Sequence, residues 1–534
     1  MIDINILDGH RVIGGNKILV EGEDGAIMLD FGINFSSWGK YFEEFLSPRS
    51  GLMVKDLLKL ELLPRFDIYR SDFTYDSDLP KLKRDILFTF LSHVHTDHMG
   101  FVGLLKENIP ILSSAETLAM AIAINEIHSE EKSRLILERR TPGEYPIRSD
   151  VLVKSRAKEK RELVKRTLIY SGQNKISALP ISVKDIEETF EEVNVEDSLA
   201  ANLVEAKILP VYHSVIGSSS LYFKLDGVRF LYTGDLRDSP SPDEERLLLE
   251  MGKNRLELAN STRKMIDLVK GKVDVLIVEG TRVKGSHSNI TEATLYGNIL
   301  EEIEKSRGKL VIADFPLRHL ERFHTFLKVA NETGREFVVL PKDYLLLSTM
   351  AVINSDWKFQ RYVNCIRVYH QGKSSWNGWE NKFLNGKIFN DPPLEKLIIH
   401  PSEIEKDPGS YILNLGYFEL SNLLDFSTST LNGGIYIHSN SETYTEDQVI
   451  DSNRLLNWLE YFNIEPKGIE RGEDKTKPSF TGNYHASGHI SPEGLENLIE
   501  EVNPAIIIPV HSESPEWFSE RWKEKVRLDH EVYI

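Results

Sequence analysis

The sequence predicts an α/β fold in which layered sheets are covered by helices. Apolar runs at residues 17–22 and 26–31 are joined by Asp-Gly, and so are the runs at 221–225 and 228–232. Asp-Gly between such runs indicates a β-hairpin. Short apolar runs predict three buried strands, at residues 86–91, 273–278 and 505–510. Helical patterns lie between the strands, as in α/β or layered α+β proteins, at residues 100–106, 244–258, 291–305 and 319–333.

The composition is that of a large globular protein with an acidic surface. The chain has 534 residues, 41% of them hydrophobic, and a formal net charge of −18. This length predicts roughly two to four domains. The acidity argues against a protein that coats nucleic acid without specificity, so a polyanionic substrate would need metals and local basic patches.

A single cysteine, Cys365, excludes an intrachain disulfide and a cysteine-rich zinc site. A reducing, cytoplasmic compartment is therefore expected. The N-terminus does not resemble a signal peptide, and the apolar runs are too short to span a bilayer, so no membrane association is expected.

Residues 130–201 are charged and only weakly periodic. Within them, residues 154–166 are rich in Lys and Arg: Lys154, Arg156, Lys158, Lys160, Arg161, Lys165 and Arg166. This basic segment is either a solvated helix face or an arm that contacts RNA phosphates.

Four residues that can bind a metal lie directly after the strand expected at residues 86–91. They are His93, His95, Asp97 and His98. Alternate side chains on an extended segment point the same way, so His93 and His95 can bind one cation together. Asp97 and His98 would face a second cation, where the chain turns into a helix near Met99. Such ligands suit Zn²⁺, with Mn²⁺ or Fe²⁺ as alternatives.

Three other apolar strands each end on one residue that can coordinate a metal: His213, Asp235 and His511. Each alone is equally well explained as a buried, hydrogen-bonded side chain. With the first four residues they complete two coordination shells, in which Asp235 bridges the two metals. We expect metal one on His93, His95 and His213, and metal two on Asp97, His98 and His511. Two such cations would activate a bridging hydroxide, which Asp97 would help to orient.

Asp30 ends the strand expected at residues 26–31. It either holds a ligand histidine from outside the coordination shell or has a purely structural role.

The segment from His93 to His98 resembles the signature of the metallo-β-lactamase superfamily, whose fold is an αββα sandwich. Residues 278–281 (Val-Glu-Gly-Thr) resemble the acidic motif that opens the β-CASP insertion of nucleic-acid hydrolases. Residues 485–489 (His-Ala-Ser-Gly-His) and 510–513 (Val-His-Ser-Glu) resemble stretches of the ribonuclease J family and its archaeal members. The long block between Glu279 and His511 is typical of the β-CASP group, and a histidine at position 511 is typical of its RNA-acting members.

The resemblance implies an αββα metallo-β-lactamase sandwich with an inserted α/β β-CASP domain. The sandwich would comprise residues 1–285 and 456–534, and the insertion residues 286–455. The implied activity is that of a zinc-dependent ribonuclease holding two Zn²⁺ or Mn²⁺ ions. It would act on single-stranded RNA as a 5′-to-3′ exonuclease, with endonuclease cleavage as a second activity in RNA processing or decay.

The resemblance also assigns catalytic roles to Asp97, Glu279, His485 and His489. The two histidines would contact the scissile phosphate, stabilising its charge and supplying a proton to the leaving oxygen. Glu279 would hold a histidine of the site and fix its tautomer.

Two other functions stay open at this point. A DNA-acting β-CASP nuclease would share the fold and the metals, whereas a catalytically silent RNA-binding subunit would typically lack metal ligands. The chain ends soon after His511, so the extra C-terminal domain of bacterial ribonuclease J is not expected. A homodimer, the direction of degradation and the 5′-end requirement are left open.

Strands at residues 308–316 and 334–341, with the helix between them, predict an α/β insertion. Arg318, His319 and Arg322 lie at the start of this helix, where backbone amides favour anions. They either bind RNA phosphates or a 5′ end, or form a solvated helix start.

Overall fold

The structure is a computed structural model of the chain. The residues that it describes are 1–43, 45–74, 78–128, 131–144, 146–154, 162–171, 176, 179, 190–251, 253–284, 290–353, 366–385, 396–443, 445–472 and 477–534.

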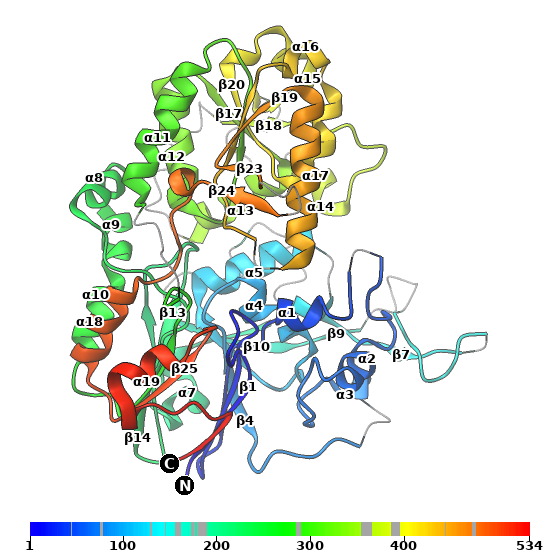
Figure 1. The fold of residues 1–534 in the computed structure, drawn as a ribbon. Helices are drawn as coiled ribbons and strands as arrows, with labels where there is room; N and C mark the ends of the chain where they lie inside the picture. The colour runs from blue at the N-terminus through cyan, green and yellow to red at the C-terminus, as the bar shows by residue number, and fades with distance from the viewer. Residues whose placement is uncertain are drawn as a thin grey trace.

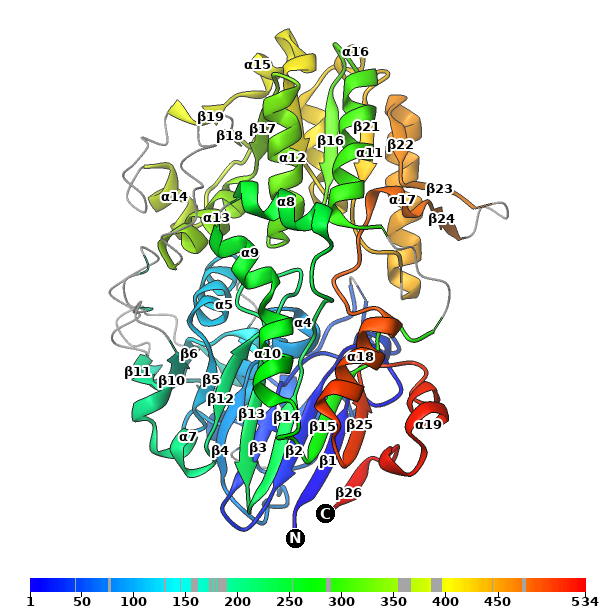
Figure 2. The same cartoon turned by 90° about the vertical axis from the view of Figure 1, so that its left-hand side faces the viewer.

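The largest sheet has eight strands in the order β11-β10-β5-β4-β3-β2-β1-β26. Its strands are β1 (Asp3–Asp8), β2 (Lys17–Glu21), β3 (Ala26–Leu29), β4 (Ile86–Phe90), β5 (Ile111–Ser114), β10 (Arg166–Ser171), β11 (Phe190–Asn194) and β26 (Glu531–Tyr533). The two ends of the described chain meet at one edge of this sheet, because β1 pairs antiparallel with β26. Both views show the termini side by side (Figures 1 and 2).

The second sheet has five strands in the order β12-β13-β14-β15-β25. These are β12 (Lys207–Pro210), β13 (Ser219–Leu225), β14 (Val228–Tyr232), β15 (Val275–Glu279) and β25 (Ile506–Val510). The two sheets pack face to face over one apolar core, to which Ile27 and Phe90 contribute from the first sheet and Phe223 and Ile277 from the second. Pro509 is tolerated in β25 because this strand lies at the edge of its sheet.

Helices cover the outer faces of both sheets. The eight-stranded sheet packs against α5 (Ala115–Ile127), with the short helices α1 (Phe35–Trp38), α2 (Met53–Lys59), α3 (Ser71–Thr74) and α4 (Thr96–Met99) nearby. The five-stranded sheet packs against α10 (Ser261–Val269), α18 (Pro492–Val502) and α19 (Glu516–Trp522). Figure 2 shows α10 and α18 in front of this sheet. The layers are therefore helix, sheet, sheet and helix, as the sequence predicts.

A third sheet lies beyond this sandwich (Figure 1). It has seven parallel strands in the order β19-β18-β17-β20-β16-β21-β22. They are β16 (Val311–Asp314), β17 (Glu336–Val339), β18 (Ile366–Tyr369), β19 (Ile398–Ile399), β20 (Tyr411–Asn414), β21 (Ile435–His438) and β22 (Glu465–Lys467). The whole sheet is formed by chain between β15 and β25 of the sandwich.

Both faces of the third sheet are covered, as parallel sheets require. One face packs against α11 (Glu292–Lys305), α12 (Leu320–Glu332) and α13 (Pro341–Ile353), and the other against α17 (Glu446–Phe462). The remaining helices are α7 (Leu199–Leu203), α8 (Pro242–Met251), α9 (Lys253–Ala259), α14 (Gly378–Leu384), α15 (Pro401–Lys406) and α16 (Thr428–Leu431). Small pairs of strands lie outside the three sheets: β6 (Leu137–Glu138) with β9 (Leu163–Val164), β7 (Thr141–Pro142) with β8 (Leu152–Val153), and β23 (Ile469–Arg471) with β24 (Pro478–Phe480).

Most predicted elements are present, and two differences have physical reasons. The helix predicted at residues 100–106 is wrong, because α4 already ends at Met99 and only a 3₁₀ turn follows, at Val102–Leu104. The helix predicted at residues 244–258 corresponds to α8 and α9, which lie on either side of residue 252, a residue outside the described part of the chain. Strand β11 was not predicted because charged residues interrupt its apolar pattern, and the short apolar run of β10 was not separated from the charged region at residues 130–201.

The basic segment at residues 154–166 is described only in part. Residues 155–161, which include Arg156, Lys158, Lys160 and Arg161, lie outside the described residues. Arg166 is buried, and its guanidinium donates to the carbonyl oxygens of Val102, Leu105 and Lys106. Burial lowers the pKa of Arg166 to about 9. Arg166 therefore holds a loop in place, and neither the solvated face nor the RNA-facing arm describes it.

Candidate metal centre

The loop after β4 and the short helix α4 carry four of the predicted ligands. His93 and His95 follow the strand, while Asp97 and His98 lie within α4. His93 Nε2 is 2.9 Å from His95 Nδ1, so the two rings direct nitrogen atoms at the same place. The predicted helix start near Met99 is corrected to Thr96, which places Asp97 in the first turn.

Three strand ends bring the other predicted ligands to this loop. His213 follows β12, Asp235 follows β14 and His511 follows β25. These strands run in the same direction within one sheet, so their carboxyl ends share one edge. His213 Nε2 lies 3.4 Å from His95 Nδ1, and His511 Nε2 lies 3.2 Å from Asp97 Oδ2.

Asp235 lies between two groups of these side chains. Its Oδ2 is 3.2 Å from His98 Nε2, 3.6 Å from His93 Nε2 and 3.9 Å from His511 Nε2. One group contains His93, His95, His213 and Asp235, the other contains Asp97, His98 and His511, and the ligand atoms within each group lie within 4.8 Å of one another. A carboxylate between two such groups is the arrangement that a pair of cations requires. We call these seven residues the ligand cluster.

Unsatisfied polar atoms in the ligand cluster also fit a bound cation. His98 Nε2 and Asp235 Oδ1 are buried, and within the described part of the chain neither makes a hydrogen bond. The contact between His98 Nε2 and Asp235 Oδ2 has the distance of a hydrogen bond but not its direction. Buried polar atoms without partners are costly, so a group that engages both atoms is expected here.

The protonation states of most of these side chains favour metal binding. His98 is the exception: burial lowers its pKa, but Asp235, Asp97 and Asp30 outweigh burial and hold that pKa well above its usual value, so a cation would have to displace a proton from this ring. Burial holds the pKa of His93 and His95 well below the ordinary value and lowers that of His213 to about 3, which leaves neutral imidazoles. Burial alone would raise the pKa of Asp235, but the nearby histidines, led by His511, hold it well below its usual range. Neutral imidazole and ionised carboxylate are the forms that coordinate a metal.

Asp30 holds one of these histidines from behind. Its Oδ2 lies 2.7 Å from His98 Nδ1, so that Nε2 of this ring faces the ligand cluster. Ser92 and Tyr232 donate hydroxyl hydrogen bonds of 2.7 and 2.6 Å to the same carboxylate. Of the two alternatives for Asp30, the structure supports the one in which it orients a histidine of the site.

Comparison with known proteins identifies the family of this fold. A family model described as the metallo-beta-lactamase superfamily matches residues 10–278, which is half of the chain. The chain belongs to the metallo-β-lactamase superfamily. This membership and the layers described above confirm the predicted αββα sandwich.

Relatives of known name match almost the full length. The chain is 22% identical over 520 residues to a protein named Ribonuclease J from Pyrococcus abyssi, with 96% of this chain and 90% of the relative covered. It is 20% identical over 550 residues to a protein of the same name from Methanocaldococcus jannaschii, with 100% and 97% covered. The predicted resemblance to the ribonuclease J family is therefore confirmed.

A solved structure has the same fold throughout. It is the crystal structure of a protein of unknown function from Enterococcus faecalis V583, with a TM-score of 0.63, 18% identity and 100% of both chains covered. Among the described residues, each helix falls short of the length or the hydrophobicity that crossing a membrane would need.

Glu279 and His489 lie beside the ligand cluster. His489 Nδ1 lies 2.9 and 3.2 Å from the two carboxylate oxygens of Glu279, and 3.8 Å from Asp235 Oδ2. Burial lowers the pKa of His489, but Glu279 and Asp235 outweigh it and raise that pKa to about 9. His489 is therefore a cation at neutral pH that lies next to the ligand cluster.

His485 is placed differently from His489. Burial, together with the charges of Arg322, Arg237 and His438, holds its pKa well below the usual range. Its Nδ1 is buried and has no hydrogen-bond partner among the described residues. The structure therefore places His489 next to the ligand cluster, whereas His485 lies among the charges of Arg322, Arg237 and His438.

Thr281 belongs to this site and was not predicted. Its Oγ1 donates to Glu279 Oε2 at 2.6 Å and lies 2.9 Å from His511 Nδ1. Thr281 thus links the partner of His489 to a ring of the ligand cluster. Its place two residues after Glu279 was the only signal in the sequence.

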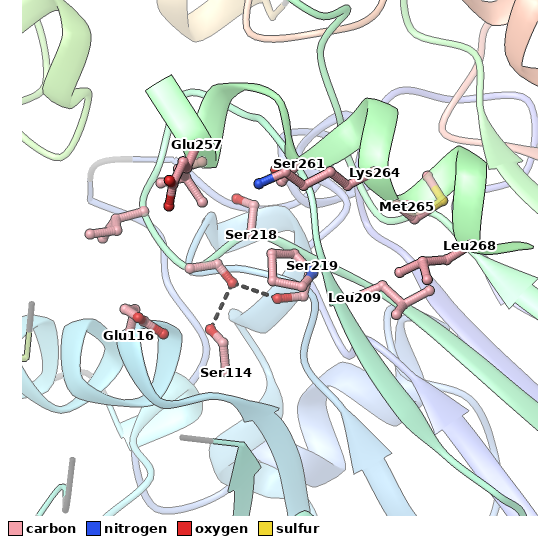
Figure 3. Close-up of a pocket in the computed structure, with 14 residues that line it drawn as sticks. Ser114, Glu116, Leu209, Ser218, Ser219, Glu257, Ser261, Lys264, Met265 and Leu268 are labelled. Atoms are coloured by element: carbon pink, nitrogen blue, oxygen red, sulfur yellow. Dashed lines mark hydrogen bonds between the residues drawn. The ribbon is translucent and has the colours of Figure 1, made fainter. Parts of the chain in front are cut away.

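The segment that carries His213 is fixed from its other side. Gly217, with φ +84°, accepts hydrogen bonds at its carbonyl from Ser114, Thr117 and Ser219 at 2.7, 2.9 and 2.8 Å. Figure 3 shows two of these bonds in a cavity of about 370 Å³ whose lining contains none of the ligand cluster. The ligand cluster and this cavity are therefore separate.

Proposed function

We propose that the protein is a metal-dependent ribonuclease that hydrolyses phosphodiester bonds in RNA. One observation carries the proposal: seven side chains that suit two cations converge in a chain that matches proteins named Ribonuclease J along nearly its whole length. The division into a sandwich of residues 1–285 and 456–534 and an insertion of residues 286–455 is part of the proposal.

The proposed cofactor is a pair of Zn²⁺ ions, with Mn²⁺ as an alternative. His93, His95 and His213 would hold one ion, Asp97, His98 and His511 the other, and Asp235 would contact both. When bound, such cations supply Lewis acidity that lowers the pKa of water and neutralises charge on the phosphodiester. Asp235 Oδ1 and His98 Nε2, which are buried without a hydrogen-bond partner among the described residues, support this assignment.

The residues beside the ligand cluster would handle charge and protons. Glu279 contacts His489 Nδ1 and favours its protonated form, so that His489 can donate a hydrogen bond to a phosphate oxygen and a proton to the leaving oxygen. Glu279 holds the Nδ1 side of His489, which leaves Nε2 to face the substrate. Asp97, beside His511, would orient the attacking water, and His485 would contact the RNA next to the scissile phosphate.

We also propose single-stranded RNA as the partner and 5′-to-3′ exonuclease as the main activity, with endonuclease cleavage as a second activity. The test uses one RNA labelled at its 5′ end, bearing either a monophosphate or a triphosphate. Release of labelled mononucleotide from the monophosphate form supports the exonuclease, and a ladder of internal products supports the endonuclease. Light scattering on the same sample tests the homodimer.

The matched variants are Asp235→Asn and His489→Ala. Asp235→Asn is expected to lower the bound metal, measured by plasma mass spectrometry, and to abolish cleavage. His489→Ala is expected to keep the metal and lower kcat roughly 10²–10⁴-fold, the usual size of a lost general acid. Arg229→Ala, at a surface ion pair with Asp274, is the control. Full activity of both site variants, or a strong preference for matched single-stranded DNA, would overturn the proposal.

A further inference from the structure

The segment Tyr484–His489 is held by cationic side chains along its backbone. Arg322 Nη1 donates to the carbonyl of Tyr484 at 3.4 Å, and Arg322 Nη2 and Arg237 Nη2 each donate to that of Ala486 at 3.5 Å. Arg237 Nε donates to the carbonyl of Ser487 at 2.7 Å. Further along, the carbonyls of Gly488 and His489 contact His213 Nδ1 at 2.6 Å and Arg282 Nη1 at 3.2 Å.

The two central arginines are buried and share a carboxylate. Arg322 is 0% exposed and Arg237 is 6% exposed. Glu292 contacts Arg322 Nη2 at 3.0 Å and Arg237 Nη2 at 3.5 Å. Breaking a buried pair of this kind leaves an uncompensated charge, so the arrangement is strongly constrained. We call Arg237, Glu292 and Arg322 the arginine clamp.

The predicted roles of Arg322 and His319 are thereby corrected. Arg322 Nη1 donates to the hydroxyl of Ser439 at 2.7 Å, and His319 Nε2 lies 3.2 Å from Arg237 Nη2. Burial and the charges of Arg322 and Arg237 hold the pKa of His319 well below its usual value, so its ring is neutral, and its Nδ1 accepts from the backbone N–H of Arg322 at 3.3 Å. Neither residue forms a solvated helix start or an open site for an RNA phosphate.

The members of the clamp come from the sandwich and from two helices of the third sheet. Arg237 lies two positions after Asp235, in the loop that follows β14 of the sandwich. Glu292 lies in α11 and Arg322 in α12, and both helices pack on the third sheet. The clamp therefore joins the two units through the backbone that carries His485 and His489.

We propose that Arg237 and Arg322 are positioning residues, which fix His489 against the ligand cluster only while the third sheet is docked on the sandwich. The expected effect of these arginines on activity rests on the proposed ribonuclease function. Their expected effect on hydrogen exchange of residues 484–489 does not. Arginine is needed because one planar guanidinium offers several donors in fixed directions, whereas lysine offers a single flexible ammonium.

The first test measures the segment itself. Hydrogen–deuterium exchange of a peptide that spans residues 484–489 is compared in the wild type, Arg237→Lys and Arg322→Lys. Lysine keeps the buried positive charge opposite Glu292, so folding is expected to survive. We expect exchange of this peptide to become at least about tenfold faster, which corresponds to a decrease of about 1.4 kcal/mol in the free energy of local opening. Peptides from β4 and β25 should be unchanged.

The second test measures catalysis in Arg237→Ala. We expect kcat to fall roughly 10²-fold while KM and the bound metal stay constant, since misplacement by about 1 Å costs this much. Millimolar methylguanidinium should restore at least part of kcat in Arg237→Ala but not in His489→Ala. Arg229→Ala, whose guanidinium pairs with Asp274 at the surface, should match the wild type in both tests.

The outcomes separate the two proposals. Unchanged exchange of residues 484–489 in both lysine variants overturns the clamp. A loss of kcat that methylguanidinium does not restore overturns the positioning role. A wild type that cleaves no RNA, with faster exchange in the lysine variants, overturns the proposed function and supports the clamp.

Discussion

Asp343 is a buried carboxyl in the first turn of α13. Asp343 is only 8% exposed. Burial raises its pKa to about 7, although the charge of Lys342 opposes this shift. An unfolded chain titrates aspartate near pH ~3.9. The folded protein therefore binds this proton more tightly. The resulting stability is present below about pH 4 and is lost as the pH rises through about 7.

We expect Asp343→Asn to stabilise the protein at pH 8 and to change little at pH 4. The amide keeps an acceptor for the backbone N–H of Leu340 and removes the buried charge. The midpoint of thermal unfolding should rise by roughly 2–4 °C for each kcal/mol gained. Asp274→Asn is the control of opposite sign, because a hydrogen bond from Arg229 lowers the pKa of Asp274. A larger gain at pH 4 than at pH 8 would contradict the assignment.

At the scale of single residues, the sequence predicted which residues belong to the site better than it predicted which side chains they contact. His93, His95 and Asp235 could be found because each lies where an apolar strand ends, next to other metal-binding residue types. Thr281 was visible only as the last residue of the motif at 278–281, since an isolated hydroxyl does not reveal which side chains it will contact. Arg322 was misjudged because its counter-charge, Glu292, comes from another helix, and no local pattern reveals such a partner.

At the scale of elements, one close approach positions α4. Gly32 follows β3, and a Cβ atom there would lie 1.7 Å from the carbonyl oxygen of Asp97 and 2.5 Å from the backbone nitrogen of His98. These are backbone atoms, which cannot move aside without shifting the helix. Glycine at position 32 therefore fixes how near α4 can lie to the strand end that carries Asp30.

We expect Gly32→Ala to displace α4 and to reduce the bound metal. Asp97 and His98 would leave their partners, so the ion that they are proposed to share with His511 should be lost first. Plasma mass spectrometry gives the metal content, and circular dichroism reports the fold. A folded Gly32→Ala protein with full metal content would contradict this role.

The same substitution at Gly297 is the matched control. Gly297 lies on the exposed side of α11, where an added Cβ meets no atom within 4 Å. Alanine favours a helix interior over glycine, so Gly297→Ala should stabilise the protein by about 0.5–1 kcal/mol and leave the metal content unchanged.

Elements with a clear apolar pattern could be predicted, and the others could not. The hairpins β2–β3 and β13–β14 match their Asp-Gly turns. Strand β11, with the sequence Phe-Glu-Glu-Val-Asn, is edge structure whose charged residues hide the alternation. Gly100, directly after α4, packs closely against Ile33, because an added Cβ would lie 2.5 Å from this side chain, and such a tertiary contact gives no local signal in the sequence.

At the scale of the whole molecule, the ligand cluster joins both sheets of the sandwich. Cations bound there would stabilise the folded chain over the unfolded one, by about 4 kcal/mol at a concentration 1,000 times the Kd. We expect chelation to lower the thermal midpoint and added Zn²⁺ to restore it. Asp235→Asn should not respond to Zn²⁺. An unchanged midpoint after verified metal loss would contradict this coupling.

The layout of the whole chain was predictable only through the family resemblance. The αββα layers and the third sheet between β15 and β25 follow from motifs at each end of a long block. The order of the seven strands in the third sheet could not be predicted, because the lengths of the intervening loops do not specify which parallel strands are neighbours. The limits at residues 285 and 455 stay predictions.

The order in which the ligand cluster is synthesised has a consequence for the cell. Its members extend from His93 to His511, and His511 follows β25, the last strand added to its sheet. A ribosome has therefore translated the whole third sheet before the final ligand exists. Under the proposed function, the growing chain stays harmless to the messenger RNA that encodes it until His511 has been added.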